Sequence, residues 1–497
     1  CPAMPADGCA AAARVASPTT AWNVAAGEEP SLPRIGADVS VTVASQNIIQ
    51  TTRLSVTDAL AWYRGLPDRL SERENTIARQ VLKEIRARLE AEFPNAGWRI
   101  RGLDRAAAGL AVAGLARVVP VARSRGLIAL AIVVAAMAPA PLLARDVSVR
   151  RELDRRPPAA VDRAEAYLRD EVRDARLPGL VFAVTHRGRP VRIASIGHAD
   201  TALAPTSGDT PFLIGSMTKS FTALAVLQLA EQGRLALDDP IADHLPWLTF
   251  AGPGPGPTIR AVLHHASGIP AGAGWKLFAG ADDPATGLAD ALADAPQLDP
   301  GTIEYSNANY VLLGQVIEAV TGTTYEAHLH RAVIEPLGLT RTTASLDVPD
   351  RARGYRMWFG VPVASDVRTP RFATPAGFVT STAGDLLTYL DAMTSDDSPI
   401  SASIRADTLD ATVDAPTGAG GEPYPGQRYA MGWVRGTIAG REVTWHSGGL
   451  ADFNSVMVST DDREWSFVVL INTASQVRSL MPDITYNVLA TLTGDAP

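Results

Sequence analysis

Ser216 and Lys219 lie three residues apart at the start of an apolar stretch that is expected to be helical. One helical turn separates positions i and i+3, so an amine and a hydroxyl at this spacing can share a proton. A serine beside a buried lysine can become a nucleophile. By itself, the spacing also fits a serine that caps a helix and a lysine exposed to solvent. Other residues must therefore decide whether the pair is catalytic.

Two later segments carry further candidate residues. Tyr305-Ser306-Asn307 is a polar tripeptide on a predicted loop, and Trp445-His446-Ser447-Gly448-Gly449 ends a predicted strand. The glycines would let the backbone approach a ligand closely. Taken singly, the first segment could be an ordinary turn and the second a strand end with a surface histidine. Their order, with the serine and lysine on a helix before them, predicts one composite site.

The elements around these residues predict a sheet built from both ends of one domain. After an arginine-rich linker at 146–158, a helix is predicted at 161–175 and a hairpin at 181–186 and 191–197. Helices are predicted at 217–232, 258–265, 310–321 and 482–492, and strands at 429–434, 442–445, 453–459 and 465–471. Strands at both ends with helices between them favour a single sheet with a mostly helical insertion.

The stretch 150–493 resembles the serine β-lactamase-like hydrolases, in the group of class C β-lactamases, D-alanyl-D-alanine carboxypeptidases, D-aminopeptidases and esterases. Besides the motifs above, the resemblance includes the segments 258–270 (TIRAVLHHASGIP), 376–386 (AGFVTSTAGDL) and 429–433 (YAMGW). It implies an α/β (α+β) fold of the β-lactamase/transpeptidase type. In that fold an antiparallel sheet built from both ends of the domain is flanked by helices.

The resemblance also implies roles for the candidate residues. Ser216 would be the acylated nucleophile and Lys219 its proton acceptor, with a pKa lowered by burial. Tyr305 would relay a proton to the leaving group and help to activate water, and Asn307 would bind the substrate amide or the lysine. The backbone N–H groups of Ser216 and Gly449 would form an oxyanion hole, worth ~3 kcal/mol per donor.

The third motif departs from the β-lactamase pattern. It reads His446-Ser447-Gly448 where the β-lactamases usually have lysine-threonine-glycine. A histidine near its reference pKa of ~6.5 is partly charged at neutral pH. We therefore expect recognition of a substrate carboxylate here to be weaker and pH-dependent. Because histidine occurs at this position in peptidase and esterase members, β-lactam hydrolysis is the activity least favoured.

Other chemistries have little support in the sequence. His264 and His265 are interpreted as structural residues of a loop motif. No HExxH, paired-cysteine or glycine-rich phosphate motif is present, so we predict no cofactor, no metal and no zinc-dependent route. The net charge of −8 and pI of about 5.6 exclude a basic nucleic-acid-binding surface. The predicted partners are small-molecule or peptide substrates.

An uncharged run at 126–144 (GLIALAIVVAAMAPAPLLA) follows Arg123 and Arg125. Its basic flank, short apolar core and small residues predict a signal peptide. A membrane anchor and a buried helix are the alternatives. We expect a secreted or periplasmic protein, which would associate with a membrane through 126–144 if that segment stays uncleaved.

The predicted domains are 1–117, 118–145 and 146–497. Within the first, 41–110 resembles part of the extracytoplasmic domain of an ABC-transporter permease of the lipoprotein-release type, on the residues 78–110. Two interpretations remain for this region and its misplaced signal-like segment: a real fusion, or a reading frame extended upstream of its true start. We favour the second. Cys1 and Cys9 are the two cysteines, so the later domain needs no disulfide.

The sequence thus predicts a serine hydrolase that acts through an acyl-enzyme on ester or amide substrates, of carboxypeptidase, D-aminopeptidase or esterase type. Three alternatives remain: a β-lactamase, a non-catalytic binding protein on the same fold, and a membrane component represented by the permease-like segment.

Overall fold

The computed structural model describes two parts of the chain, which form compact units at Cys1–Met137 and Ala138–Pro497. In the first unit it describes two short strands, β1 (Thr42–Val43) and β2 (Gln46–Asn47), which pair antiparallel. In the second it describes 149–154, 158–200, 202, 204–250, 256–277, 288, 292, 301–358, 361–365, 370–415, 424, 426–474 and 480–494. The signal-like segment 126–144, and the permease-like segment apart from these two strands, lie outside the described residues. The signal peptide at 126–144, the permease-like segment and the division into three domains therefore stay predictions.

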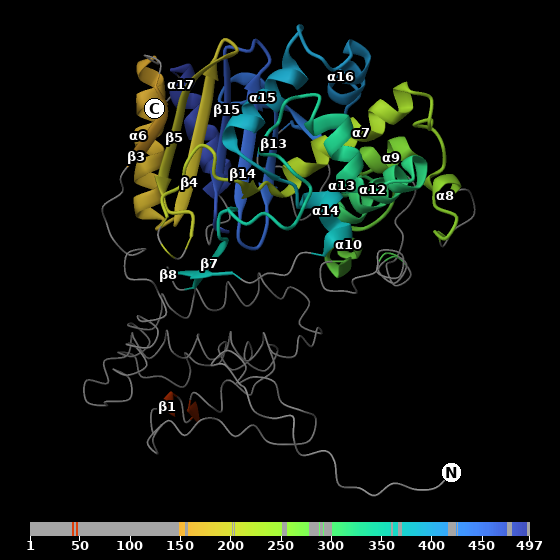
Figure 1. Cartoon of the computed structure of the whole chain (residues 1–497), viewed down its shortest axis with the longest axis horizontal. Helices are drawn as coiled ribbons and strands as arrows, with labels where there is room; N and C mark the ends of the chain where they lie inside the picture. The colour runs from red at the N-terminus through yellow and green to blue at the C-terminus, as the bar shows by residue number, and fades with distance from the viewer. Residues whose placement is uncertain are drawn as a thin grey trace, which may run out of the picture. The chain divides into compact units, whose positions relative to one another are not determined.

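The second unit is built on an antiparallel sheet, which has nine strands within the described residues and the order β10-β11-β12-β13-β14-β15-β4-β5-β3 (Figure 1). Strand β15 pairs with β4 and so joins the C-terminal strands to the N-terminal ones. This pairing confirms the sheet predicted from both ends of the domain. The strands are β3 (Val149–Asp154), β4 (Gly179–His186), β5 (Arg189–Gly197), β10 (Val413–Asp414), β11 (Arg428–Ala430), β12 (Trp433–Ile438), β13 (Arg441–Gly449), β14 (Asn454–Thr460) and β15 (Trp465–Ile471).

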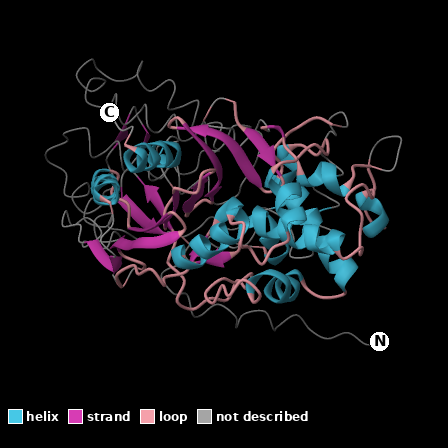
Figure 2. Ribbon diagram, turned by 90° about the horizontal axis from the view of Figure 1, so that it is seen from above, coloured by secondary structure: helices cyan, strands magenta, loops and turns pink. Residues whose placement is uncertain are grey.

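Both faces of the sheet are buried, each against its own set of helices. Along β4, Val181 and Ala183 belong to one apolar cluster while Phe182 and Val184 belong to another, as the two-residue period of a strand requires. Helices α6 (Ala159–Asp174) and α17 (Leu480–Thr493) pack together over the second cluster. Helix α15 (Ala383–Thr394) covers the other face. Figure 2 shows helices on both sides of the strands. The sheet is therefore the middle layer of three.

A group of helices lies beside the α15 face and holds the site. Its centre is α7 (Thr218–Glu231), which packs against α12 (Asn307–Thr321) and α14 (Thr374–Gly377). Helix α7 is apolar on all sides and buried along most of its length, which is typical of a core helix. The other elements here are β6 (Phe212–Leu213), η3 (Gly215–Met217), α8 (Ile241–His244), α9 (Ile259–Leu263), α10 (Ala271–Leu277), α13 (Tyr325–Leu329), η4 (His330–Ile334), β7 (Tyr355–Trp358), β8 (Val361–Ala364), η5 (Arg371–Ala373), β9 (Thr380–Ser381) and α16 (Ala402–Leu409).

Three predicted boundaries were wrong in ways that concern the site. The linker at 146–158 contains β3, because its backbone pairs with the edge of β5. The predicted strand 429–434 is two strands with a turn at 431–432. Strand β13 continues through the His446–Gly449 motif, which pairs along its whole length with β14. Each difference is explained by pairing between strands, which cannot be predicted from the local sequence of one strand.

Among the helices that the structure describes, none combines the length and apolar character needed to cross a membrane.

Candidate active site

Ser216 lies in the short helix η3, between β6 and α7, and is half-buried. Three hydrogen bonds fix the backbone around it. Ile214 N donates to Val379 O at 3.0 Å, Val379 N donates to Thr218 Oγ1 at 3.1 Å, and Ser455 Oγ donates to Ile214 O at 2.7 Å. The serine is therefore held between β9 on one side and β14 on the other.

Glycines let this turn touch strand β13. Gly215 has a φ of +55°, and a Cβ at this position would lie 2.8 Å from Gly449 N. A Cβ at Gly448 would lie 2.0 Å from Ile214 O. Any side chain at either position would separate the turn from the strand. The contact places the backbone of Gly449 against the turn that carries Ser216, as the predicted oxyanion hole of these two N–H groups requires.

Lys219 lies one helical turn after Ser216 and is fully buried. Its Nζ lies 3.1 Å from Ser216 Oγ, 2.7 Å from Asn307 Oδ1 and 2.6 Å from Ala376 O. None of the acidic side chains that the structure describes forms an ion pair with it. Burial without a counter-charge lowers the pKa of Lys219 well below its usual value.

This geometry suits a neutral amine. Two N–H groups of an uncharged Lys219 satisfy the Asn307 and Ala376 oxygens, which can only accept. The nitrogen lone pair then faces the hydroxyl of Ser216. The three neighbours of the amine are thus arranged for a proton to pass from the serine to the lysine.

Tyr305 and Asn307 lie on the opposite side of Lys219 from α7. The Lys219 Nζ lies 4.9 Å from the centroid of the Tyr305 ring. Asn307 is the first residue of α12, rather than part of the predicted loop, and its Oδ1 accepts from the lysine. Of its two predicted partners, the lysine is therefore the one seen in the structure.

His446 differs from the sequence-based expectation of a partly charged side chain. It is 4% exposed, and burial lowers its pKa to about 3, so it is neutral at physiological pH. Its Nδ1 donates to Ser447 O at 2.6 Å, which leaves Nε2 as the acceptor nitrogen. Nε2 is buried, and no described residue bonds to it. The predicted pH-dependent positive charge near pH 6.5 is therefore wrong.

The rest of the predicted motif lies along β13. His446 pairs with Met457, whose side chain belongs to the cluster on the helical face, so the histidine points toward α7. Ser447 is half-buried on the other face of the strand. Gly449 is exposed and lies at the strand end.

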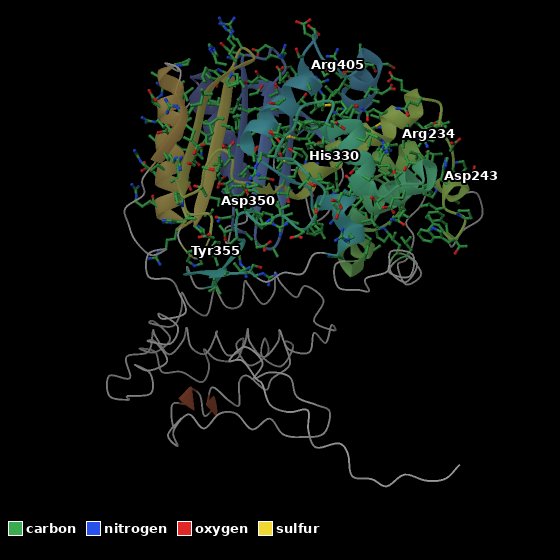
Figure 3. All side chains as sticks on the ribbon, in the orientation of Figure 1. Arg234, Asp243, His330, Asp350, Tyr355 and Arg405 are labelled. Atoms are coloured by element: carbon green, nitrogen blue, oxygen red, sulfur yellow. The ribbon has the colours of Figure 1, made fainter. Side chains whose placement is uncertain are left out.

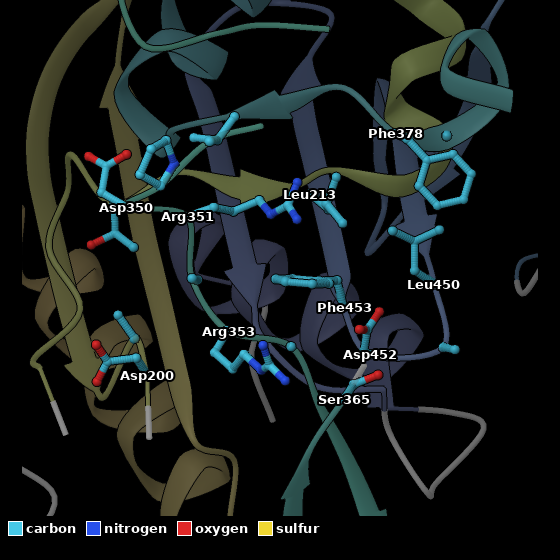
Figure 4. A pocket seen from close by; sticks show the side chains of 18 of the residues that line it. Asp200, Leu213, Asp350, Arg351, Arg353, Ser365, Phe378, Leu450, Asp452 and Phe453 are labelled. Carbon is cyan, nitrogen blue, oxygen red and sulfur yellow. The ribbon is translucent and has the colours of Figure 1, made fainter. Parts of the chain in front are cut away.

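A cavity of about 1370 Å³ opens at this point. Ser216, Asn307 and Gly449 line one part of it, and the remaining walls come from the segments 199–213, 341–365, 376–378 and 450–453 (Figure 4). Tyr305 and His446 are not part of the lining. Ser216 and the predicted oxyanion hole are thus reached from one large cavity.

A model of the β-lactamase family matches residues 164–491, which is more than half of the chain. The chain belongs to the β-lactamase family. Protein flp of Staphylococcus aureus (strain COL) is 26% identical over 329 residues, which are 63% of each chain. The chain thus spans about 63% of the length of this curated relative. The predicted family and fold are confirmed.

Solved structures with the same fold include two above 25% identity. The penicillin-binding protein homologue from Pyrococcus abyssi is 26% identical with a TM-score of 0.59, over 68% of this chain and 78% of that one. A D-stereospecific amidohydrolase from Streptomyces sp. is 28% identical with a TM-score of 0.55, over 68% of this chain and all of the other. Both support the β-lactamase-family fold described above.

His265, interpreted from the sequence as a structural residue of a loop motif, lies beside Tyr305 in this β-lactamase-family site. Its ring lies 4.4 Å from the Tyr305 ring, between centroids, and is 1% exposed. Its Nδ1 accepts from Ser306 N at 3.2 Å and lies 3.0 Å from Asn309 Nδ2, and its carbonyl accepts from Glu304 N. Both neighbours of Tyr305 in sequence are therefore bonded to His265. No local signal distinguished it from His264, which makes none of these contacts.

Within the part of the chain that the structure describes, no group of three or more His, Cys, Asp or Glu side chains is placed to hold a metal ion.

Proposed function

We propose that this protein is a serine hydrolase that forms an acyl-enzyme at Ser216 on an ester or amide substrate. The observation that carries the proposal is the position of Lys219, a buried amine without a counter-charge, 3.1 Å from the Ser216 hydroxyl. A lysine in solvent would stay protonated and could not act as a base. Burial supplies the neutral amine that the step needs.

In the first step, the Ser216 Oγ–H proton passes to Lys219 Nζ while Oγ bonds to the substrate carbonyl carbon. The carbonyl oxygen becomes an oxyanion, which accepts hydrogen bonds from the N–H groups of Ser216 and Gly449. When the intermediate collapses, the bond to the leaving group breaks and that group takes a proton through Tyr305. A water molecule then repeats the addition and frees Ser216.

The substrate is proposed to be a peptide-like amide or an ester, as for a carboxypeptidase, D-aminopeptidase or esterase. Two observations support this choice over a β-lactam. His446 is neutral, so the third motif offers no cation to a substrate carboxylate. One of the structures similar to this chain is a D-stereospecific amidohydrolase.

Covalent labelling of Ser216 tests the proposed step. The full chain and its Ser216→Ala variant are treated with a fluorophosphonate, and the intact mass of each is measured. We expect one adduct on the wild-type chain and none on the variant. An adduct that persists on Ser216→Ala would remove Ser216 as the nucleophile, and a chain that never reacts would favour a non-catalytic binding protein.

The substrate class needs a separate panel of short-chain 4-nitrophenyl esters, D-alanyl anilides and a chromogenic cephalosporin. We expect the esters or anilides to be turned over faster than the cephalosporin. If the cephalosporin reacted fastest, the protein would be a β-lactamase instead.

We also propose that the protein is secreted or periplasmic, on the basis of the segment 126–144. N-terminal sequencing of the protein isolated from its native cells tests this. A mature chain that begins just after Ala144 is the expected result. A chain that retains 126–144 and fractionates with membranes would support the anchor instead.

A further inference from the structure

The cavity beside Ser216 has an apolar part and a charged part. Its apolar walls are Leu213, Phe378, Leu450 and Phe453. Figure 4 shows Phe378 and Leu450 close together, with Asp452 below them and Arg351 and Arg353 to their left in this view. The charged residues of the lining are Asp200, Asp209, Arg341, Asp350, Arg351, Arg353, Arg356 and Asp452.

Among the outer charged residues of the lining, Arg341 is already paired. Arg341 forms an ion pair with Asp350 and also donates to the Asp209 carbonyl. Asp200 accepts from the backbone N–H of Ala204 in a turn. Figure 3 shows Asp350 at the same end of the second unit as Tyr355, away from Arg405. The guanidinium of Arg341 therefore already has its counter-charge within the protein.

The inner charges are unequal. Asp452 is 8% exposed. Burial raises the pKa of its carboxyl, while the nearby Ser365, Arg356 and Arg351 lower it. A Cβ at Gly354 would lie 2.5 Å from Asp452 Oδ2, so the backbone between the two arginines lies directly against this carboxylate. Among the described residues, no ion pair joins Arg351 or Arg356 to a carboxylate. Both guanidinium groups are therefore partly buried positive charges without a directly bonded counter-charge, which is costly.

The hydrogen bonding of these arginines is also incomplete. Arg351 donates to Leu346 O at 3.3 Å, and burial lowers its pKa. The Nε of Arg356 is buried and has no hydrogen-bond partner among the described residues. A guanidinium has five N–H donors arranged to bind a carboxylate through two of them. An anionic ligand in the cavity would supply the counter-charge that no described side chain provides to these arginines.

The position of the cavity relative to Tyr305 indicates which part of a substrate would reach Arg351 and Arg356. Asp452 lies in the turn that follows Gly449 at the end of β13, where Leu450 N donates to Phe453 O. Tyr305 and His446, on the side where the leaving group is proposed to take its proton, do not line the cavity. The cavity therefore extends from Ser216 away from the leaving group, toward the acyl part of the substrate.

We propose that Arg351 and Arg356 bind a carboxylate at the far end of the substrate's acyl group, with an apolar spacer between it and the scissile carbonyl. This inference rests on the proposed acyl-enzyme function for the direction of the substrate. It assigns to the arginines the anion recognition that the neutral His446 cannot provide.

Paired esters test the subsite. Mono-4-nitrophenyl adipate, suberate and sebacate end in a carboxylate, whereas 4-nitrophenyl hexanoate, octanoate and decanoate end in a methyl group. The readout is the ratio of kcat/KM for each anionic ester to that of its neutral partner. At the best chain length we expect Arg351→Gln and Arg356→Gln to lower this ratio about tenfold, which corresponds to about 1.4 kcal/mol.

Two further variants make the test specific. Asp452→Asn removes the competing carboxylate, so the ratio should rise above the wild-type value. Arg341→Gln changes a cavity arginine that is already paired, so the ratio should stay at the wild-type value. If the arginine variants lowered kcat/KM equally for the anionic and the neutral ester of each pair, at every chain length, the role of the arginines would be structural. The proposal would then be wrong.

A binding measurement separates failure of the subsite from failure of the proposed function. Ser216→Ala retains the cavity, so calorimetry can compare its binding of monomethyl suberate and methyl octanoate without turnover. We expect Ser216→Ala to bind monomethyl suberate more tightly than methyl octanoate. This preference should be lost in the double variant Ser216→Ala with Arg356→Gln. If no ester is hydrolysed but this preference is found, the hydrolase proposal fails and the anion site stands. Equal binding of both compounds would overturn the anion site.

Discussion

At the scale of single residues, the decisive property is the burial of Lys219. The sequence placed this amine one turn from Ser216, but a lysine at that spacing could equally have pointed into solvent. In the fold its Nζ is surrounded by a hydroxyl, an amide oxygen and a backbone carbonyl. None of these is charged. The local chemistry thus favours a neutral amine over an ammonium ion.

Replacing Lys219 by methionine tests this description. A base of this kind contributes about 10²- to 10⁴-fold to the rate, so we expect fluorophosphonate labelling of Ser216 in Lys219→Met to slow by at least about 10²-fold. Methionine removes the cost of burying the amine but leaves the Asn307 and Ala376 oxygens without this donor, so the melting temperature should change little. Labelling rates from intact mass, with melting curves alongside, provide both readouts. A slow and strongly destabilised variant would indicate a structural role for the lysine instead.

At the scale of elements, the site depends on backbone contacts between segments far apart in the chain. The turn before α7 touches β13 through Gly215, Gly448 and Gly449. The segment before α12 is held by His265, which follows α9. Each candidate side chain is therefore positioned by an element from another part of the sequence.

Two glycine variants separate backbone strain from this contact. Gly215 and Gly233 both have positive φ, +55° and +67°, but a Cβ would meet other atoms within 4 Å only at Gly215 of this pair. Alanine at either site should cost about 1–2 kcal/mol of unfolding free energy for the left-handed backbone. We expect Gly215→Ala alone to lose about 10²- to 10³-fold in labelling rate, as when an oxyanion donor is displaced. Urea unfolding and labelling rates measure the two effects, and equal labelling by both variants would contradict the proposed contact.

Variants of His265 test whether it positions Tyr305. His265 has a φ of +57°, a conformation that asparagine tolerates better than most residues. Asparagine can also accept from Ser306 N, whereas leucine cannot. We expect His265→Leu to lower kcat about tenfold or more with a smaller change in KM, since Tyr305 acts on the leaving group. His265→Asn should recover much of that loss, and a similar kcat for both variants would refute the positioning role.

At the scale of the whole molecule, the fold buries several groups in their neutral form. His264, His265 and His446 are all buried, and burial lowers the pKa of each, to about 4 for His264 and about 3 for His446. In the unfolded chain a histidine has a pKa of ~6.5. Below that pH the unfolded chain therefore binds more protons than the folded one. Stability should be fully present above pH ~6.5 and should fall as the pH approaches the folded pKa values.

Unfolding at two pH values measures this coupling. Each buried histidine can cost up to about 1.4 kcal/mol per pH unit below ~6.5, so the free energy of unfolding should be lower at pH 5 than at pH 7.5. We expect His446→Gln to show a smaller difference between the two. His330 is exposed (Figure 3), and His330→Gln should retain the full wild-type difference. A pH dependence that was the same in all three proteins would exclude His446 as a contributor.

The sequence by itself determined the family, the sheet built from both ends of the domain and the residues Ser216, Lys219, Tyr305 and Asn307. These rest on local patterns: a helical spacing, alternating strands and short motifs. The tertiary structure decided the charge state of His446, the contacts of His265 and the placement of Arg351 and Arg356 in the cavity beside Ser216. Those properties depend on burial and on which segments meet in space, and neither is encoded in the neighbouring residues of the chain.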